Sequence, residues 1–289
     1  MKKFTKIMLI VAGAIAGIGV LCMVVAFAMG LTTDSLMQMV QDGKFAFDMS
    51  DVLVLKRAEI ITEEEVQVIT GEEFDEKSDE WKFYIDEECN AIDLDFAAGT
   101  LDIYYDDVEE IQIQHKNIDG FNAEVKNGVL NIDEELNLSI GNTKDRSLVV
   151  IIPNEMSFDE VDLEIGASQA DIDGLNAKDI SITIGAGQAN ISNITADTME
   201  LEVGAGEAIV ANLSVEKIDV KVGMGQVDLG LYGAQTDYNY NVECAMGNVV
   251  VGHHAYGGLS TGHHSQNHHA SKMLNVECGM GEVRVKFHE

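Results

Sequence analysis

Six of the chain's eight histidines lie in one short segment rich in glycine and serine, residues 252–271. Imidazole nitrogen is a common ligand of zinc, nickel and copper, and several imidazoles must converge to hold one ion. We therefore expect a zinc, nickel or copper site on this segment. The alternative is a solvated loop in which the histidines are merely exposed. The candidate ligands are His253, His254, His263, His264, His268 and His269.

The rest of the sequence has no pattern typical of catalysis or of cofactor binding. The four cysteines lack Cys-x-x-Cys spacing, and none has a catalytic signature around it. Asp171 begins a stretch that resembles a calcium loop, but Ile182 stands where the closing glutamate is required. We expect no catalytic residues, no cofactor-binding residues and no enzymatic activity.

The net charge of the chain is −32, from 18 lysines and arginines against 50 aspartates and glutamates. Nucleic acid is excluded as a partner class, because phosphate binding requires clustered cations. The acidic bias is strongest in residues 59–110, which hold 20 acidic residues and two lysines. Such a stretch is typical of a solvated, self-repelling surface.

The N-terminus predicts a membrane anchor. Residues 7–29 form an uncharged run of 23 residues that follows Lys2, Lys3 and Lys6. A helix of this length spans the bilayer core of about 30 Å. The preceding lysines favour a cytoplasmic N-terminus, so we expect a single-pass protein of the cell membrane with an extracellular C-terminal domain. The alternative is a signal peptide cleaved after Ala28.

A repeat of 19 residues organises the sequence from residue 163 onward. Apolar residues recur in six columns, and the first column is Leu163, Ile182, Leu201 and Val220. Stacked β-strand coils explain a constant period of this size, because each coil buries the same positions against its neighbour. The other columns begin at Ile165, Ala167, Ala170, Ile172 and Leu175, and end at Val222, Met224, Val227, Leu229 and Tyr232.

Each repeat contains a corner marked by small residues such as Gly204-Ala205-Gly206. Side chains alternate across a strand, so an extra residue in the apolar register indicates a bulge or a bend. We expect Ala205 to point inward, Gly204 to point outward and Gly206 to adopt a positive φ angle. The same pattern predicts Cys244 and Cys278 to be buried thiols on neighbouring coils, with a disulfide as the alternative.

These patterns predict an all-β chain, a single-stranded β-solenoid with coils of about 19 residues and an N-terminal transmembrane helix. A two-sheet sandwich is the alternative, but sandwiches seldom keep a constant coil length. The expected parts are a cytoplasmic tip and anchor (1–30), an acidic membrane-proximal stalk or cap (31–80), and a solenoid ectodomain (81–289) that contains the insertion 252–271.

The segments AIDLDFAAGTLDI, GVLNID and VVIIPNEMSFDEVDLEIG precede the glycine-centred repeats. In this order they resemble the bacterial putative-adhesin family of β-strand-repeat envelope proteins, a domain of unknown function, over roughly residues 80–289. The resemblance implies a solenoid exposed at the cell envelope that binds an envelope or host-surface ligand, and it carries over no catalytic residues. We expect a non-enzymatic, membrane-anchored surface protein, or alternatively an envelope metal-binding or metal-sensing protein that uses the histidine segment.

Overall fold

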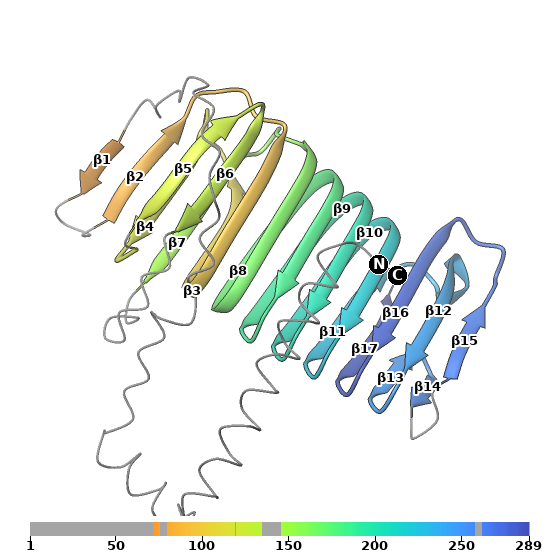
Figure 1. The fold of residues 1–289 in the computed structure, drawn as a ribbon. Coiled ribbons are helices and arrows are strands. Elements are labelled where there is room, and N and C mark those ends of the chain that lie inside the picture. The colour runs from red at the N-terminus through yellow and green to blue at the C-terminus, as the bar shows by residue number, and fades with distance from the viewer. Residues whose placement is uncertain (1–71, 76–79, 119, 135–145, 258–261, 289) are drawn as a thin grey trace, which may run out of the picture. The chain divides into compact units, whose positions relative to one another are not determined.

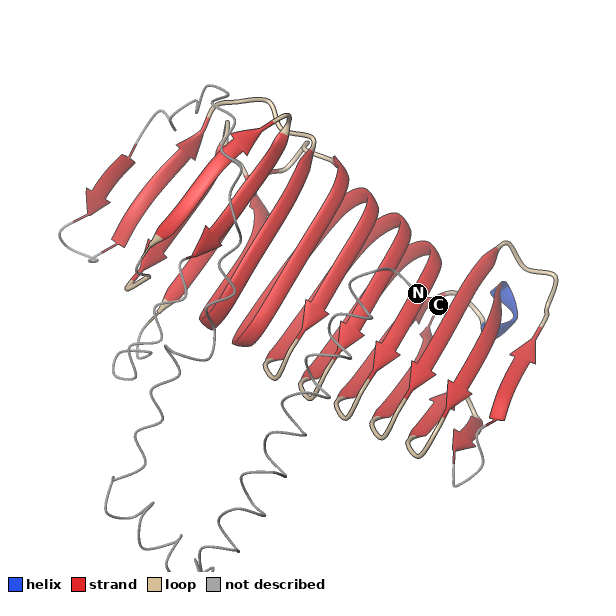
Figure 2. Cartoon of the chain, viewed as in Figure 1, coloured by secondary structure: helices blue, strands red, loops and turns tan. Residues whose placement is uncertain are grey.

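The computed structural model describes residues 72–75, 80–118, 120–134, 146–257 and 262–288. All of them belong to one compact unit, Thr62–Glu289, and nearly all are strands and tight turns (Figure 2). The all-β prediction is confirmed. Among these residues no helix is long and apolar enough to cross a membrane. The predicted anchor at 7–29 lies outside the described residues, and the predicted domain limits stay predictions.

Seventeen strands and one turn of 3₁₀ helix make up the described part of the chain. In chain order they are β1 (Glu72–Asp75), β2 (Glu80–Ile85), β3 (Ala91–Asp106), β4 (Ile111–Lys116), β5 (Phe121–Lys126), β6 (Val129–Glu134), β7 (Ser147–Pro153), β8 (Phe158–Ile184), β9 (Gln188–Val203), β10 (Glu207–Val222), β11 (Gln226–Tyr232), η2 (Gln235–Asp237), β12 (Tyr238–Cys244), β13 (Asn248–Val251), β14 (His254–Gly257), β15 (Gly262–Gln266), β16 (Lys272–Cys278) and β17 (Glu282–His288).

Strands β8, β9 and β10 stack in parallel, and each residue pairs with the residue one repeat further along the chain. Ile182 pairs with Leu201, and Leu201 pairs with Val220, so partners are 19 residues apart. Each strand bends through a corner and continues on the other side of the coil (Figure 1). Because equivalent residues lie directly above one another, the apolar columns form one continuous core, in which Leu163, Ile182 and Leu201 are each fully buried.

The coils near the C-terminus are not stacked in sequence order. Strands β16 and β17 pair with β10 and β11 on one side and with β12 and β13 on the other. The last segment of the chain is thus inserted between two coils that precede it in the sequence (Figure 1). Cys244 and Cys278 become register partners, and both are buried free thiols, as predicted.

Antiparallel strands close both ends of the stack. At the C-terminal end β14 pairs with β13 and β15 pairs with β12. At the N-terminal end β5 pairs with β6, while β4 pairs with β7 and is followed by β2 and β1. An open strand edge presents unpaired backbone groups that template aggregation. The histidine-rich insertion is therefore part of the cap of the stack.

The structure corrects the expected register at the glycine corners. Ala205 is exposed, and Met224, one coil further on, is 64% exposed. The buried corner residue is Gly206. Inward residues of a strand are normally two apart, and the extra residue at this corner therefore lies between Val203 and Gly206 rather than between Ala205 and Ala208. A separate correction applies at the end of the sixth column, where Leu231 is buried and Tyr232 is 43% exposed. Leu231, and not Tyr232, pairs with Leu213, because β11 lacks the extra residue that β10 has between Val210 and Leu213.

Close approach of the backbones, and not backbone torsion, requires glycine at these corners. A Cβ on Gly206 would lie less than 3.0 Å from the carbonyl oxygen of Gly187 in the preceding coil, and the same clash recurs at Gly225 and Gly281. The predicted positive φ angle is wrong here, because these glycines are not among the residues with positive φ. The left-handed conformation occurs at a second corner instead, at Gly174, Asn193 and Asn212.

We predict that Gly206→Ala lowers the free energy of unfolding by about 1–3 kcal/mol, because the added methyl group overpacks the backbone contact between two coils. The matched control is Ala205→Ser at the adjacent exposed position, which should change stability by less than about 0.5 kcal/mol. Denaturant unfolding of both variants measures the difference. Equal shifts of the two midpoints would show that the corner register described here is wrong.

A buried histidine lies in the N-terminal cap. The His115 ring stacks on Phe121 at a centroid distance of 4.1 Å and on Phe83 at 5.5 Å. Its Nδ1 atom is buried without a hydrogen-bond partner among the described residues. Burial lowers the pKa of His115 to about 4, so the ring is neutral in the folded protein at neutral pH.

We predict that His115 makes the domain acid-sensitive. The folded pKa lies below the ordinary value of 6.5, so its contribution to stability is complete above pH 6.5 and is lost as the pH falls towards about 4. The loss is about 1.4 kcal/mol per pH unit in this window. His115→Phe keeps the aromatic stack and should lose less stability between neutral pH and pH 5 than the wild type does. Parallel losses in chemical unfolding would contradict this prediction.

Candidate binding face and histidine cap

One outer surface of the stack carries two continuous columns of polar side chains, which we name the ladder face. The columns lie on β8, β9, β10, β16 and β12, where outward residues alternate with the buried apolar ones. Strand pairing brings equivalent positions of successive coils side by side. The first column is Ser181, Glu200, Asp219, Asn275 and Asn241, and the second is Thr183, Glu202, Lys221, Glu277 and Glu243.

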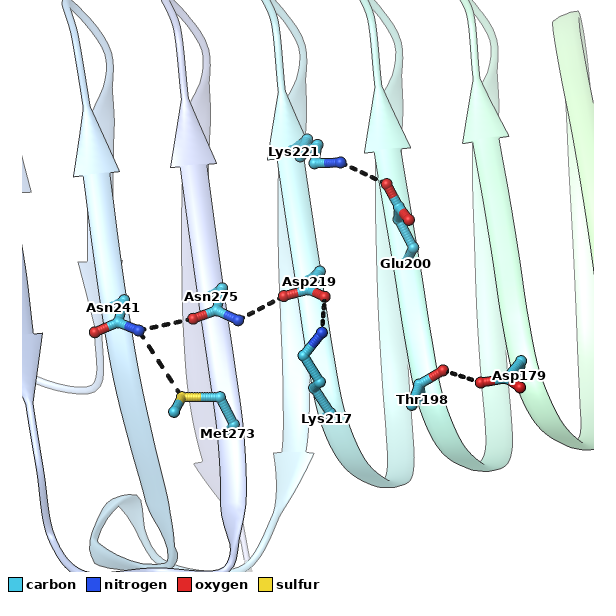
Figure 3. A network of polar contacts seen from close by, with 9 residues as sticks. All are labelled: Asp179, Thr198, Glu200, Lys217, Asp219, Lys221, Asn241, Met273 and Asn275. Carbon is cyan, nitrogen blue, oxygen red and sulfur yellow. Dashed lines mark hydrogen bonds and ion pairs between the residues drawn. The ribbon is translucent and has the colours of Figure 1, made fainter. Parts of the chain in front are cut away.

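Hydrogen bonds between coils hold the first column in place (Figure 3). Asn241 donates to Asn275 at 2.9 Å, and Asn275 donates to Asp219 at 2.5 Å. Lys217 also donates to Asp219, at 2.6 Å. Burial alone would raise the pKa of Asp219, but the bonds from Lys217 and Asn275 bring the pKa below its ordinary value. The column is a preorganised row of charged and amide groups.

The second column borders a shallow hollow of about 580 Å³. Glu202, Lys221, Glu277 and Glu243 line it, together with the strand segments that carry the buried residues Cys244 and Cys278. Burial and the neighbouring Cys244 raise the pKa of Cys278 to about 11, which disfavours the nucleophilic thiolate. The groups that face solvent here suit charged and hydrogen-bonding contacts.

Acidic side chains dominate the surface next to the N-terminal end of the ladder face, where Asp95 of β3 pairs with Glu164 of β8. Burial raises the pKa of Asp95, and the charges of Asp133 and Asp93 raise it further. Glu164 is affected in the same way, first by burial and then by Asp95. This part of the surface has a negative potential that attracts basic groups.

All six candidate histidine ligands lie in the C-terminal cap. His254 is on β14, and His263 and His264 are on β15. His263 pairs with Glu243 of the ladder face at 2.9 Å, and the ring of His264 lies 5.0 Å from that of Tyr256. The remaining three, His253, His268 and His269, occupy the flanking turns.

The side chains of these histidines do not converge on a common position in the structure. Nδ1 of His268 lies 2.8 Å from the backbone oxygen of Tyr238. Within the described ranges, no group of three or more histidine, cysteine, aspartate or glutamate side chains is arranged to hold a metal ion. The metal site stays a prediction, and the fold gives the segment a second role that the sequence did not indicate.

Sequence reasoning identified the outward polar positions but not their connection into one face. The contact from Asn241 through Asn275 to Asp219 depends on the insertion of β16 between β10 and β12. Asn275 lies 56 residues from Asp219 in the chain and outside the 19-residue period. No local signal marks such a pairing.

Comparison with known proteins gives one family and several distant structures. A family model described as Toastrack DUF4097 matches residues 89–288. No curated protein matches the chain. Among solved structures, a putative cell adhesion protein from Clostridium sporogenes is 17% identical, with a TM-score of 0.41 over 72% of this chain and 99% of that one.

Two further solved structures show the same level of similarity. A putative adhesin from Bacteroides fragilis is 12% identical, with a TM-score of 0.33 over 72% of this chain and 97% of that one. A putative lipid binding protein from Parabacteroides distasonis is 13% identical, with a TM-score of 0.39 over the same shares, 72% and 97%. With TM-scores below 0.5, these similarities carry no argument about this chain.

Proposed function

Because the chain belongs to the Toastrack DUF4097 family, we propose that it is a non-enzymatic, adhesin-like binding scaffold of the cell envelope. The ladder face is the observation that supports this proposal. Several of its side chains are held by bonds between coils, and its positions repeat at the spacing of the strands, so a partner meets a preorganised, mainly acidic surface. The partner is an envelope or host-surface ligand that carries basic groups.

Residues 7–29 anchor this scaffold in the lipid bilayer, and residues 31–80 separate the anchor from the coils. The β-solenoid ectodomain, residues 81–289, then lies outside the cell. Three lysines directly before the apolar run support this orientation. The acidic surface keeps the domain soluble and repels other acidic surfaces, which favours a basic partner.

We predict that neutralising the ladder face weakens binding about tenfold, or roughly 1.4 kcal/mol. The ladder variant is Glu200→Gln, Glu202→Gln, Glu243→Gln and Glu277→Gln. The control removes as many carboxylates elsewhere on the coils: Asp171→Asn, Asp197→Asn, Glu207→Gln and Glu216→Gln. Labelled full-length chain in detergent is titrated onto bacterial envelopes and onto cultured animal cells at two salt concentrations.

The expected result is saturable, salt-sensitive binding that the ladder variant reduces and the control keeps. Equal binding by both variants would remove the ladder face from the proposal. The absence of saturable binding to either surface would overturn the scaffold function.

A second candidate function is metal binding or metal sensing by the histidine cap. The observation that favours it is that all six histidines lie on β14, β15 and their flanking turns, at one end of the stack. His253, His254, His263, His264, His268 and His269 are then ligands for zinc, nickel or copper.

We predict that the full-length chain binds one of these divalent ions at neutral pH with micromolar or tighter affinity. Replacing the six histidines by asparagine should abolish the calorimetric heat of binding while β14 and β15 still cover β13 and β12. This design keeps the cap, whereas a deletion would expose two strand edges. No heat from the wild type, or the same heat from an equally stable variant, would eliminate the metal function.

A further inference from the structure

Three exposed methionines occupy the glycine corners of the last three coils. Met224, Met280 and Met246 are 64%, 56% and 62% exposed. The equivalent residues of the three preceding coils are Ala167, Ala186 and Ala205, all exposed as well. The corner therefore does not require a large side chain, and the packing of the core does not explain the methionines.

Backbone hydrogen bonds place the three methionines on adjacent coils. The backbone nitrogen of Met280 donates to Gly223 at 2.8 Å, and that of Met246 donates to Gly279 at the same distance. Met280 thus lies between Met224 and Met246, although it is the last of them in the sequence. Adjacent coils are about 4.8 Å apart, so the three side chains leave the corner in a row at that spacing.

The surface around the row is hollowed. The three methionines line a shallow cavity of about 670 Å³ together with Gly225, Gly281 and Gly247, which contribute no side chains. Glu207 lines the same cavity and adds negative charge to it, whereas Glu282, also in the lining, is paired with Arg284 at 2.6 Å. A methionine side chain has three rotatable bonds and adapts easily, so the outer two sulfurs have room to turn towards the central one.

We propose that Met224, Met280 and Met246 form a binding site for a soft monovalent cation, Cu(I), with Ag(I) as its analogue. Thioether sulfur is a soft, uncharged donor that selects Cu(I) over hard cations. Three such donors on adjacent coils supply a complete set of sulfur ligands, with Met280 in the middle. The nearby carboxylate of Glu207 raises the local concentration of cations without being a ligand itself.

This site is chemically distinct from the histidine cap. Imidazole binds zinc and nickel as well as copper, whereas a site made of thioethers alone selects Cu(I) and does not hold zinc or nickel well. The buried pair Cys244 and Cys278 is the competing sulfur site, because thiolates also bind Cu(I). The two sulfur sites are separated by substitution.

The test measures Cu(I) affinity of the full-length chain in detergent, without oxygen, by competition with bathocuproine disulfonate. The variant Met224→Leu, Met246→Leu and Met280→Leu keeps apolar side chains of similar size and removes only the sulfurs. The control, Met156→Leu and Met273→Leu, changes two methionines away from the corner row. A third variant, Cys244→Ala and Cys278→Ala, removes the thiols, and circular dichroism checks that each variant is folded.

We expect the wild type to bind one Cu(I) per chain. In the triple leucine variant the dissociation constant for Cu(I) should rise about 100-fold. The control and the cysteine variant should bind as the wild type does, excess zinc should not compete, and X-ray absorption should show a shell of sulfur only. Unchanged affinity in the folded triple variant, or loss of binding in the folded cysteine variant, would overturn the proposal. If the cysteine variant is not folded, the triple leucine variant and the absorption spectrum decide alone.

Discussion

The close approach between coils at the glycine corners sets the geometry on which the other features depend. The carbonyl oxygen of Gly187 occupies the space that a side chain on Gly206 would need, and the contact repeats from coil to coil. Because the backbones meet there, β9 and β10 each follow the preceding coil in the same register. Regular register in turn produces the buried apolar columns, the polar ladder face and the row of methionines.

A stack of parallel coils has two open ends, and closing them shapes the rest of the domain. Strands such as β15 pair antiparallel with the last coil, so no row of backbone groups of β12 is left unpaired there. The histidine segment contributes this strand. The histidines that would bind a metal therefore lie in the segment that caps the stack. Metal binding there is coupled to the stability of the last coil.

The surfaces of the stack differ in whether their side chains already have bonding partners within the protein. On the ladder face, Asp219 accepts from both Lys217 and Asn275, so its groups are fixed before any partner arrives. At the methionine corner the thioethers remain largely exposed. The first surface suits recognition by charge and shape, and the second suits a ligand that supplies its own strong bonds to sulfur.

The sequence by itself determined the fold class, the 19-residue coil and most of the core. Columns such as Leu163, Ile182 and Leu201 could be predicted because burial in a repeated fold imposes the same residue type at the same interval. Strands outside the repeat, for example β4 and β7, could also be predicted from local alternation and turn residues.

Only the tertiary structure decided the corner register, the order of the last coils and the role of the histidine segment. Alanine and glycine are compatible with either side of a strand, so the sequence could not show whether Ala205 or Gly206 points inward. The insertion of β16 beside β10 and the pairing of β15 with β12 join residues far apart in the chain. Such pairings follow from how the whole chain satisfies its strand edges, and local patterns contain no information about them.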